Sequence, residues 1–464
     1  MNNGIFYGFA LAVLSLAGLV FASALARRTR LLSFRVLIIL VYTGTNLVSG
    51  VVHVLGLSQR VGYFDALNQL ESKQLGEVVF LTALGLAAVT AGASLGISGK
   101  TPASPRMTDL APFDRSLIIV FVALIFPISL FALVRIREYA AGVQVFGGRI
   151  ISVAGGVARF SYISSWMVWA ISLSVIYLVF RTGRRQSLMP TFLLFGSMVA
   201  IASVFAWNGG RSAAVLMALP LIMVMAPRLR VNKRIVVASG SVIAIFYFAL
   251  VARVTASRFA ESRLSPTGVT DWVDWEWGRF SMLGWAVQFV DRNGYLYGET
   301  FIQRISVLAD GIFRLLGSTS GDIAQRSSMD VAGESILNSS SAIYIVPGLS
   351  AEFFLNFGAF GIAIGYLILG RLCGWVDGRF DSSATPITRL MWAYVGVELV
   401  FRTITLDSGA AVTNLLFIGA PLIGAAAASH YASRRSEPTM WVPAASMRPR
   451  ANAGRVHRPR GADL

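Results

Sequence analysis

The residues best suited to chemistry in this 464-residue chain are arginines and one carboxylate near the ends of long apolar runs. Arg211 follows two glycines and precedes Ser212, at a turn between two such runs. The glycines allow a tight turn, and Ser212 can cap the next helix, whose N-terminus favours anions. This pattern predicts a small phosphate-binding nest. The alternative is an ordinary turn whose arginine extends to lipid headgroups.

Two further ionisable residues lie inside apolar runs, where charge is costly and usually faces a cavity or a partner. Glu352 lies near the start of one run, where a carboxylate is suited to general-base work on a hydroxyl. Its structural alternative is a contact with the helix dipole or a nearby arginine. Arg402 lies four residues after Glu398, so these two can share a helix face and pair. Glu352, Arg211 and Arg402 are therefore the candidate catalytic residues.

A polar stretch between apolar runs combines aromatic and charged residues. Trp275 and Trp277 alternate with acidic residues, and Trp faces can stack on sugars while carboxylates bind sugar hydroxyls. The alternative is an interfacial aromatic belt. Arg253, Arg279 and Arg304 lie in the same stretch and can clamp a pyrophosphate, unless they pair with its own acids. These five residues are the candidate substrate-binding residues.

The composition excludes several classes of protein. Hydrophobic residues make up 55% of the chain and charged residues 14%, against about 25% charged in a soluble domain. A soluble enzyme, a disordered protein and a coiled coil are excluded, and an outer-membrane barrel is disfavoured because its strands are short and alternating. The single cysteine, Cys373, excludes a disulfide framework and a Cys-built zinc site. We predict no metal and no cofactor.

Apolar runs of 18 or more residues recur along the chain and predict about eleven membrane spans. The first run is followed by Arg27, Arg28 and Arg30, which places the N-terminus outside and the C-terminus in the cytoplasm. With that alternation the six inner segments hold 23 Lys and Arg, and the three short outer segments hold seven. The expected spans are 4–26, 33–57, 76–98, 116–134, 162–180, 187–206, 212–226, 235–252, 343–370, 387–405 and 410–430.

The predicted fold is an all-α polytopic protein of the inner membrane, in four regions. About eight membrane helices occupy 1–252, and 253–341 is an extracytoplasmic loop domain of nearly balanced charge. About three more helices occupy 342–430, and a basic tail, 431–464, is expected to be disordered and can contact anionic lipid. Membrane topology explains the net charge of +17 better than nucleic-acid binding does, because no soluble domain carries that charge.

Taken in chain order, several of these elements resemble those of a known family. The order and topology across roughly 200–405 are similar to those of the O-antigen polymerase (Wzy-type), or oligosaccharide repeat-unit polymerase, family, although no single motif is specific. The elements are Gly210-Arg211-Ser212, Tyr297-Gly298-Glu299-Thr300, Ser350-Ala351-Glu352 with Asn356-Phe357-Gly358 and Gly361, and Phe401-Arg402. The family often has Pro-rich sequence after its Tyr-Gly-x-Thr-like element. Residues 306–310 differ here, so no function is carried onto them.

The resemblance implies a metal-independent glycosyltransferase with a C-type fold, acting at the outer leaflet on undecaprenyl-pyrophosphate-linked oligosaccharides. The growing glycan would move from its carrier to a newly flipped repeat unit, and a chain-length regulator would be a partner. By this resemblance Arg211 and Arg402 contact the pyrophosphate, and Glu352 contacts the acceptor hydroxyl or positions an arginine.

Two alternative functions remain open. An O-antigen ligase resembles this family but relies on a histidine in the outer loop, and the three histidines here lie elsewhere. A lipid-linked-oligosaccharide flippase or other transporter usually has internal repeats and broken helices near mid-membrane. No internal repeat is evident in this sequence.

Overall fold

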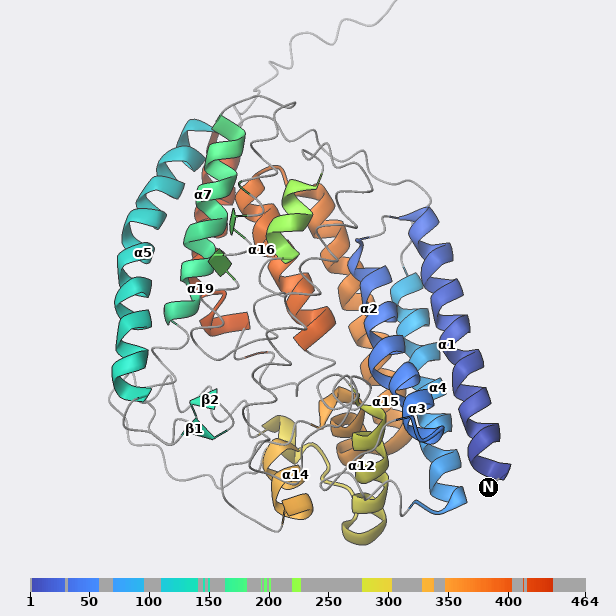
Figure 1. Cartoon of the computed structure of the whole chain (residues 1–464). Helices are drawn as coiled ribbons and strands as arrows, with labels where there is room; N and C mark the ends of the chain where they lie inside the picture. Colours follow the sequence, from blue (N-terminus) through green and yellow to red (C-terminus); the bar gives the residue numbers. More distant parts are fainter. Residues whose placement is uncertain are drawn as a thin grey trace, which may run out of the picture.

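A computed structural model of the chain is helical apart from a short ladder in which β1 (Val145–Phe146) pairs antiparallel with β2 (Arg149–Ile150), within the residues that it describes (Figure 1). These residues are 2–29, 32–57, 70–95, 110–140, 145–146, 149–150, 163–181, 193, 196–197, 200–201, 219–226, 278–302, 328–337, 347–402, 412 and 415–436.

Six helical segments of the described chain are long and apolar enough to cross a membrane, which confirms an all-α membrane protein. The count of eleven spans stays a prediction, because those expected in 187–252 and 410–430 fall wholly or partly outside the described residues. The six are α1 (Asn2–Arg28), the run α2 (Phe34–Tyr42), η1 (Thr43–Val48) and α3 (Ser49–Val54), α4 (Ser72–Ser94), α5 (Pro112–Ala140), a segment with α7 (Met167–Arg181), and α15 (Gly348–Ser382).

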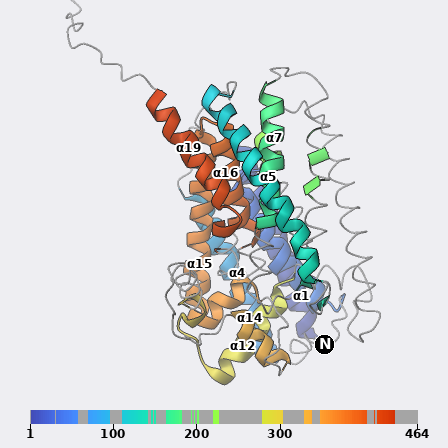
Figure 2. The ribbon, with the colours of Figure 1, turned by 90° about the vertical axis from the view of Figure 1, so that its left-hand side faces the viewer.

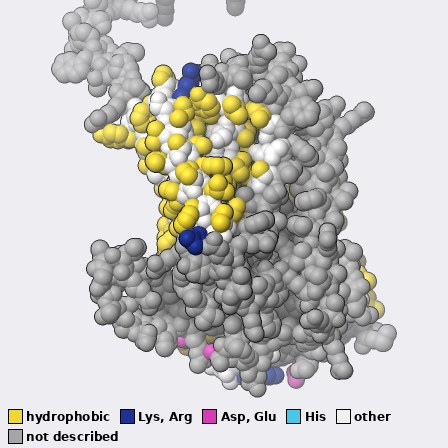
Figure 3. Space-filling view, turned by 60° about the vertical axis from the view of Figure 1, so that its left-hand side comes forward, with side chains coloured by type: hydrophobic (Ala, Val, Ile, Leu, Met, Phe, Trp, Pro, Cys, Tyr) yellow, Lys and Arg dark blue, Asp and Glu magenta, His cyan; other side chains and the backbone are white. Residues whose placement is uncertain are grey.

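The outer face of α5 is apolar along its length. Large side chains such as Ile119, Leu124 and Phe131 are more than half exposed. Figure 3 shows this face as an apolar band with basic side chains at both ends. An apolar surface of this size is unstable in water and suits the hydrocarbon of a bilayer.

The helices form two groups joined in the middle. Figure 1 shows α1, α2 and α4 on one side, α5, α7 and α19 (Ala420–Ser436) on the other, and α15 with α16 (Pro386–Val397) between them. α15 packs on α4, and α16 contacts both α15 and α19. α12 (Phe280–Asn293) and α14 (Ser328–Leu337) lie at the end where α1 begins (Figures 1 and 2). The described part of the expected loop domain is therefore helical and lies at that end.

α15 extends further than the sequence pattern predicts. We expected a span over 343–370 followed by an inner loop, but the helix continues to Ser382, with a break at Gly358, where φ is +61°. The part after Gly358 is 24 residues long, about 36 Å, and its second half carries Arg371, Asp377 and Arg379, so its uncharged stretch is 359–370. Arg371 and Arg379 thus lie on helix rather than in a loop.

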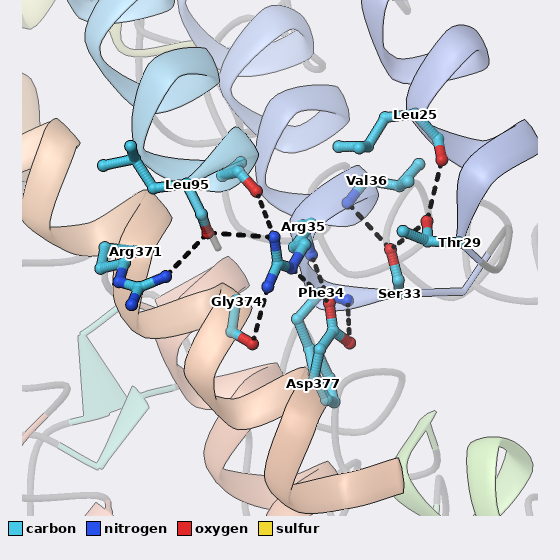
Figure 4. A network of polar contacts seen from close by, with 11 residues as sticks. Leu25, Thr29, Ser33, Phe34, Arg35, Val36, Leu95, Arg371, Gly374 and Asp377 are labelled. Atoms are coloured by element: carbon cyan, nitrogen blue, oxygen red, sulfur yellow. Dashed lines mark hydrogen bonds and ion pairs between the residues drawn. The ribbon is translucent and has the colours of Figure 1, made fainter. Parts of the chain in front are cut away.

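A buried ion pair ties three helices together at the end opposite α12 (Figure 4). The Asp377 carboxylate accepts the backbone N–H groups of Phe34 (2.9 Å) and Arg35 (3.1 Å), so α15 satisfies the first turn of α2. The Arg35 guanidinium lies 3.8 Å from Asp377 and donates to the carbonyls of Ala93 (2.8 Å), Leu95 (3.2 Å) and Gly374 (3.3 Å).

Candidate functional site

Glu352 lies on the short first part of α15 and is 1% exposed. The Thr300 hydroxyl donates to Glu352 Oε1 at 3.3 Å. Asn356, one turn further along α15, donates through Nδ2 to Thr300 Oγ1 (2.8 Å) and to the backbone carbonyl of Glu352 (2.7 Å). Thr300 therefore bridges two side chains of α15 from a segment more than 50 residues away.

The segment that carries Thr300 is a turn docked beside the break in α15. The Leu296 N–H donates to the Leu355 carbonyl (2.8 Å), and the Gly298 N–H donates to Asn356 Oδ1 (2.9 Å). Backbone polar groups buried at a break need partners, and this turn supplies one donor to the Leu355 carbonyl and a second to the Asn356 side chain. The segments 296–300 and 352–358 thus form one structural unit.

Aromatic rings cover this unit. Phe301 stacks on Phe353 and Phe357, with ring centroids 6.0 and 6.1 Å apart. A Cβ added at Gly358 would lie 2.9 Å from the Tyr295 hydroxyl, so this ring would have to shift, and the positive φ independently favours glycine. Tyr297 is 79% exposed, with φ of +46°, and is the open tip of the turn.

Arg279 directly precedes α12, is buried, and packs its side chain against the start of α15. Its N–H donates to the Thr45 carbonyl (2.8 Å), and its Nη1 donates to the Gly278 carbonyl (2.8 Å). Its aliphatic stem covers Gly348, the first residue of α15, where an added Cβ would lie 2.6 Å from Arg279 Cδ. The Arg279 stem therefore has a structural role: it packs against Gly348, which lies four residues before Glu352.

A π-helix joins the site from the other side. Asn46 lies in η1, fully buried, and its Oδ1 accepts a hydrogen bond from the Ser350 hydroxyl at 3.0 Å. The Ser350 hydroxyl also lies 2.6 Å from the Tyr366 hydroxyl. π-Helical turns occur often at functional sites. Polar side chains on the first part of α15 thus contact both η1, midway along the Phe34–Val54 segment, and the 296–300 turn.

Two of the eight predicted site residues, Glu352 and Arg279, have described side chains. Arg402 ends the π-helix η3 (Glu398–Arg402), but its side chain lies outside the described residues. Its pairing with Glu398 therefore stays a prediction. Arg211, Arg253, Arg304, Trp275 and Trp277 lie outside the described residues. A shared cluster of guanidinium groups stays a prediction.

Sequence reasoning gave no role to Thr300, Asn356, Asn46 or Ser350. Asn46 was detectable, because an amide inside an apolar run is a functional signal by default. Thr300 and Asn356 lay within the quoted motifs, but no spacing rule links residues that far apart.

The described polar side chains of this site hold one another in position and are not exposed to a substrate. At 1% exposure the Glu352 carboxylate is closed to a substrate in this conformation, while its contact with Thr300 connects it to the exposed turn. Within the described residues, no three His, Cys, Asp or Glu side chains are grouped closely enough to hold a metal ion. The chain matches no family model, no curated protein and no solved structure.

Proposed function

We propose that the protein is a polysaccharide polymerase, a membrane glycosyltransferase. It would transfer a growing glycan from undecaprenyl pyrophosphate onto a lipid-linked oligosaccharide repeat unit at the outer leaflet of the inner membrane. One observation carries the proposal: the 297–300 and 350–358 elements, both named in the resemblance, meet through Thr300, Glu352 and Asn356.

The proposed reaction is an in-line displacement with inversion. An acceptor hydroxyl oxygen attacks the anomeric carbon, and the bond from that carbon to the pyrophosphate oxygen breaks. The leaving undecaprenyl pyrophosphate takes the electron pair, and the hydroxyl proton passes to a base and then to water. The scheme uses no nucleotide or metal, because the donor is already activated. Fixed guanidinium groups stabilise the developing charge best in a low-dielectric site.

We assign these roles to the residues named from sequence. Arg211 and Arg402 contact the pyrophosphate, together with Arg253 and Arg304 of the polar stretch. Arg279 supports the start of α15, as its contacts with Thr45 and Gly348 favour. Trp275 and Trp277 stack on the sugar rings.

Glu352 is the carboxylate of the proposed site, and its contacts favour a positioning role. By accepting the Thr300 hydroxyl it holds the 296–300 turn against α15. The orientation that suits this chemistry has the N-terminus and α12 outside. It agrees with Arg27 and Arg28 at the opposite end of α1.

The test is chain extension by the purified protein in phospholipid vesicles, supplied with synthetic undecaprenyl-pyrophosphate-linked repeat units. We expect Arg211→Ala and Arg402→Ala to lower kcat by about 100-fold or more, as loss of an oxyanion donor does. Glu352→Gln should lower kcat more than it raises KM, and Glu352→Asp should restore part of the rate. Glu77→Gln, an exposed carboxylate of α4 at the same end, is the control.

Extension that survives both Arg211→Ala and Glu352→Gln would reject these roles. Folded wild-type protein that extends no chains would reject the polymerase. An O-antigen ligase would be recognised in the same assay by its transfer of glycan to an acceptor other than the repeat unit.

The break at Gly358 favours a transporter as the second candidate, since transporters use broken helices near the midplane. A deletion strain separates the two functions. Loss of a polymerase leaves single repeat units at the outer face, and loss of a flippase leaves none.

A further inference from the structure

One face of α15 is apolar over the depth of one membrane leaflet. Exposed large apolar side chains recur every four residues: Phe360 (72%), Ile364 (39%), Ile368 (53%) and Leu372 (39%). They cover about 18 Å of helix, close to half of the roughly 30 Å hydrocarbon core. This face leads toward the end of α15 opposite the candidate site.

Arg371, Trp375 and Arg379 continue along α15 at four-residue spacing, and all three are exposed. Arg371 Nη1 donates to the Leu95 carbonyl at 2.8 Å, where α4 ends. Arg379 Cζ lies 5.5 Å from the Trp375 ring centroid, and the Trp375 ring packs edge-on against Trp392 of α16. Each guanidinium is thus held in place while keeping N–H groups for another partner.

The charge around these arginines is positive. The Asp377 carboxylate is turned toward α2, where it accepts two backbone N–H groups (Figure 4). Asp381, two residues after Arg379, lies on a different face of the helix. Arg35 donates to the same Leu95 carbonyl as Arg371, so two guanidinium groups converge on one oxygen.

We propose that this surface binds one anionic phospholipid of the cytoplasmic leaflet. Its headgroup phosphate would lie between Arg371 and Arg379, which are about 12 Å apart along the axis with Trp375 midway. An acyl chain would lie along Phe360–Leu372. The depth of the apolar face, the interfacial Trp and the excess positive charge match the three parts of such a lipid. The proposal does not depend on the polymerase function.

The experiment is mass spectrometry of the intact, purified protein titrated with phosphatidylglycerol or phosphatidylcholine. We expect the wild-type protein to bind phosphatidylglycerol more tightly than phosphatidylcholine. The double variant Arg371→Gln/Arg379→Gln should bind it about 25-fold more weakly, at about fivefold per guanidinium. Phosphatidylcholine binding should stay unchanged. Arg371→Lys/Arg379→Lys should retain most of the binding, because the charge remains.

The matched control is Arg27→Gln/Arg28→Gln, which removes two exposed arginines at the same end of the bundle. This variant should bind phosphatidylglycerol as wild type does. An equal loss of phosphatidylglycerol affinity in the control would show that binding depends on general surface charge, and would overturn the proposed site. Unchanged binding in the α15 variant, with normal gel filtration and thermal unfolding, would also overturn it. Displacement of the lipid by millimolar inorganic phosphate would identify an ion site instead.

Discussion

Thr300 links the two segments of the candidate site through a single hydroxyl. That hydroxyl donates to Glu352 and accepts from Asn356, and the bonds join groups buried from water. A buried polar group left without its partner costs more free energy than the bond itself contributes. The free energy of unfolding should therefore fall when this one oxygen atom is removed.

Thr300→Val should lower the free energy of unfolding by about 1–3 kcal/mol, because Glu352 loses a donor and Asn356 loses an acceptor. Chemical denaturation in detergent micelles measures this change. Thr90→Val is the control, since the buried Thr90 hydroxyl has no hydrogen-bond partner within the described chain. We expect the control to change stability by less than about 0.5 kcal/mol. Equal effects of the two variants would contradict the bridging role of Thr300.

At the scale of elements, close glycine contacts set the approach of α4 to α15. A Cβ at Gly370 would lie 2.5 Å from the Val89 carbonyl oxygen, and one at Gly92 would meet the Leu367 carbonyl oxygen. Both obstacles are backbone, which cannot move aside. Small residues at such crossings are the usual basis of helix packing in membranes.

Gly370→Ala should destabilise the protein by about 1–3 kcal/mol, the range for an overpacked contact. Gly378→Ala is the matched control on the same helix, because an added Cβ there meets nothing within 4 Å. Alanine is the better helix former, so the control should be neutral or stabilising by up to about 1 kcal/mol. Thermal unfolding of both variants checks this prediction. A stable Gly370→Ala would mean that the two helices can separate freely.

Substitutions of Arg35 and Asp377, the ion pair at the other end of α15, should have coupled effects on stability. Arg35→Met leaves the Asp377 carboxylate with its two backbone donors but without its cation, and removing one partner of a buried pair costs about 3–5 kcal/mol. In a double-mutant cycle with Asp377→Asn, the double variant should lose less stability than the two single losses together. Arg371→Gln, an exposed donor to the same carbonyl as Arg35, should cost less than about 1 kcal/mol. Strict additivity would show that the pair does not interact.

The sequence predicts the elements better than their contacts. Apolar runs at 4–26, 76–98 and 116–134 correspond to α1, α4 and α5, because a bilayer demands a minimum apolar length. The run at 343–370 predicts the apolar part of α15 but not the further turns, which continue to Ser382. These turns carry Arg371, Asp377 and Arg379, which packing and interfacial contacts accommodate. A hydropathy scale assigns such charged residues to a loop.

The contacts of the site were beyond sequence reasoning for a related reason. Glu352 stood out as a charge in an apolar run, but its bond to Thr300 depends on how a turn docks across the break at Gly358. Asp377 and Arg35 are 342 positions apart in the chain, and neither residue specifies the other. Local spacing constrains one helix, whereas these pairs depend on the arrangement of several.

At the scale of the whole molecule, both proposals depend on which end of the bundle faces outward. The 296–300 turn and the start of α15 are at one end, and Arg371, Arg379 and the end of α15 are at the other. The only cysteine, Cys373, is buried, so an introduced cysteine can be labelled without first replacing it. Tyr297 and Ser382 are exposed and mark the two ends.

We expect Tyr297→Cys to react with a membrane-impermeant maleimide in intact spheroplasts, and Ser382→Cys to react only after the membrane is permeabilised. The reason is the excess of arginine near the Ser382 end, which the positive-inside rule keeps in the cytoplasm. Wild-type protein, with Cys373 alone, is the control and should stay unlabelled in both conditions. The reverse pattern would place Glu352 and Thr300 on the cytoplasmic side of the membrane. Transfer between lipid-linked glycans at the outer leaflet could not then occur there, and the arginines of α15 would face the wrong leaflet.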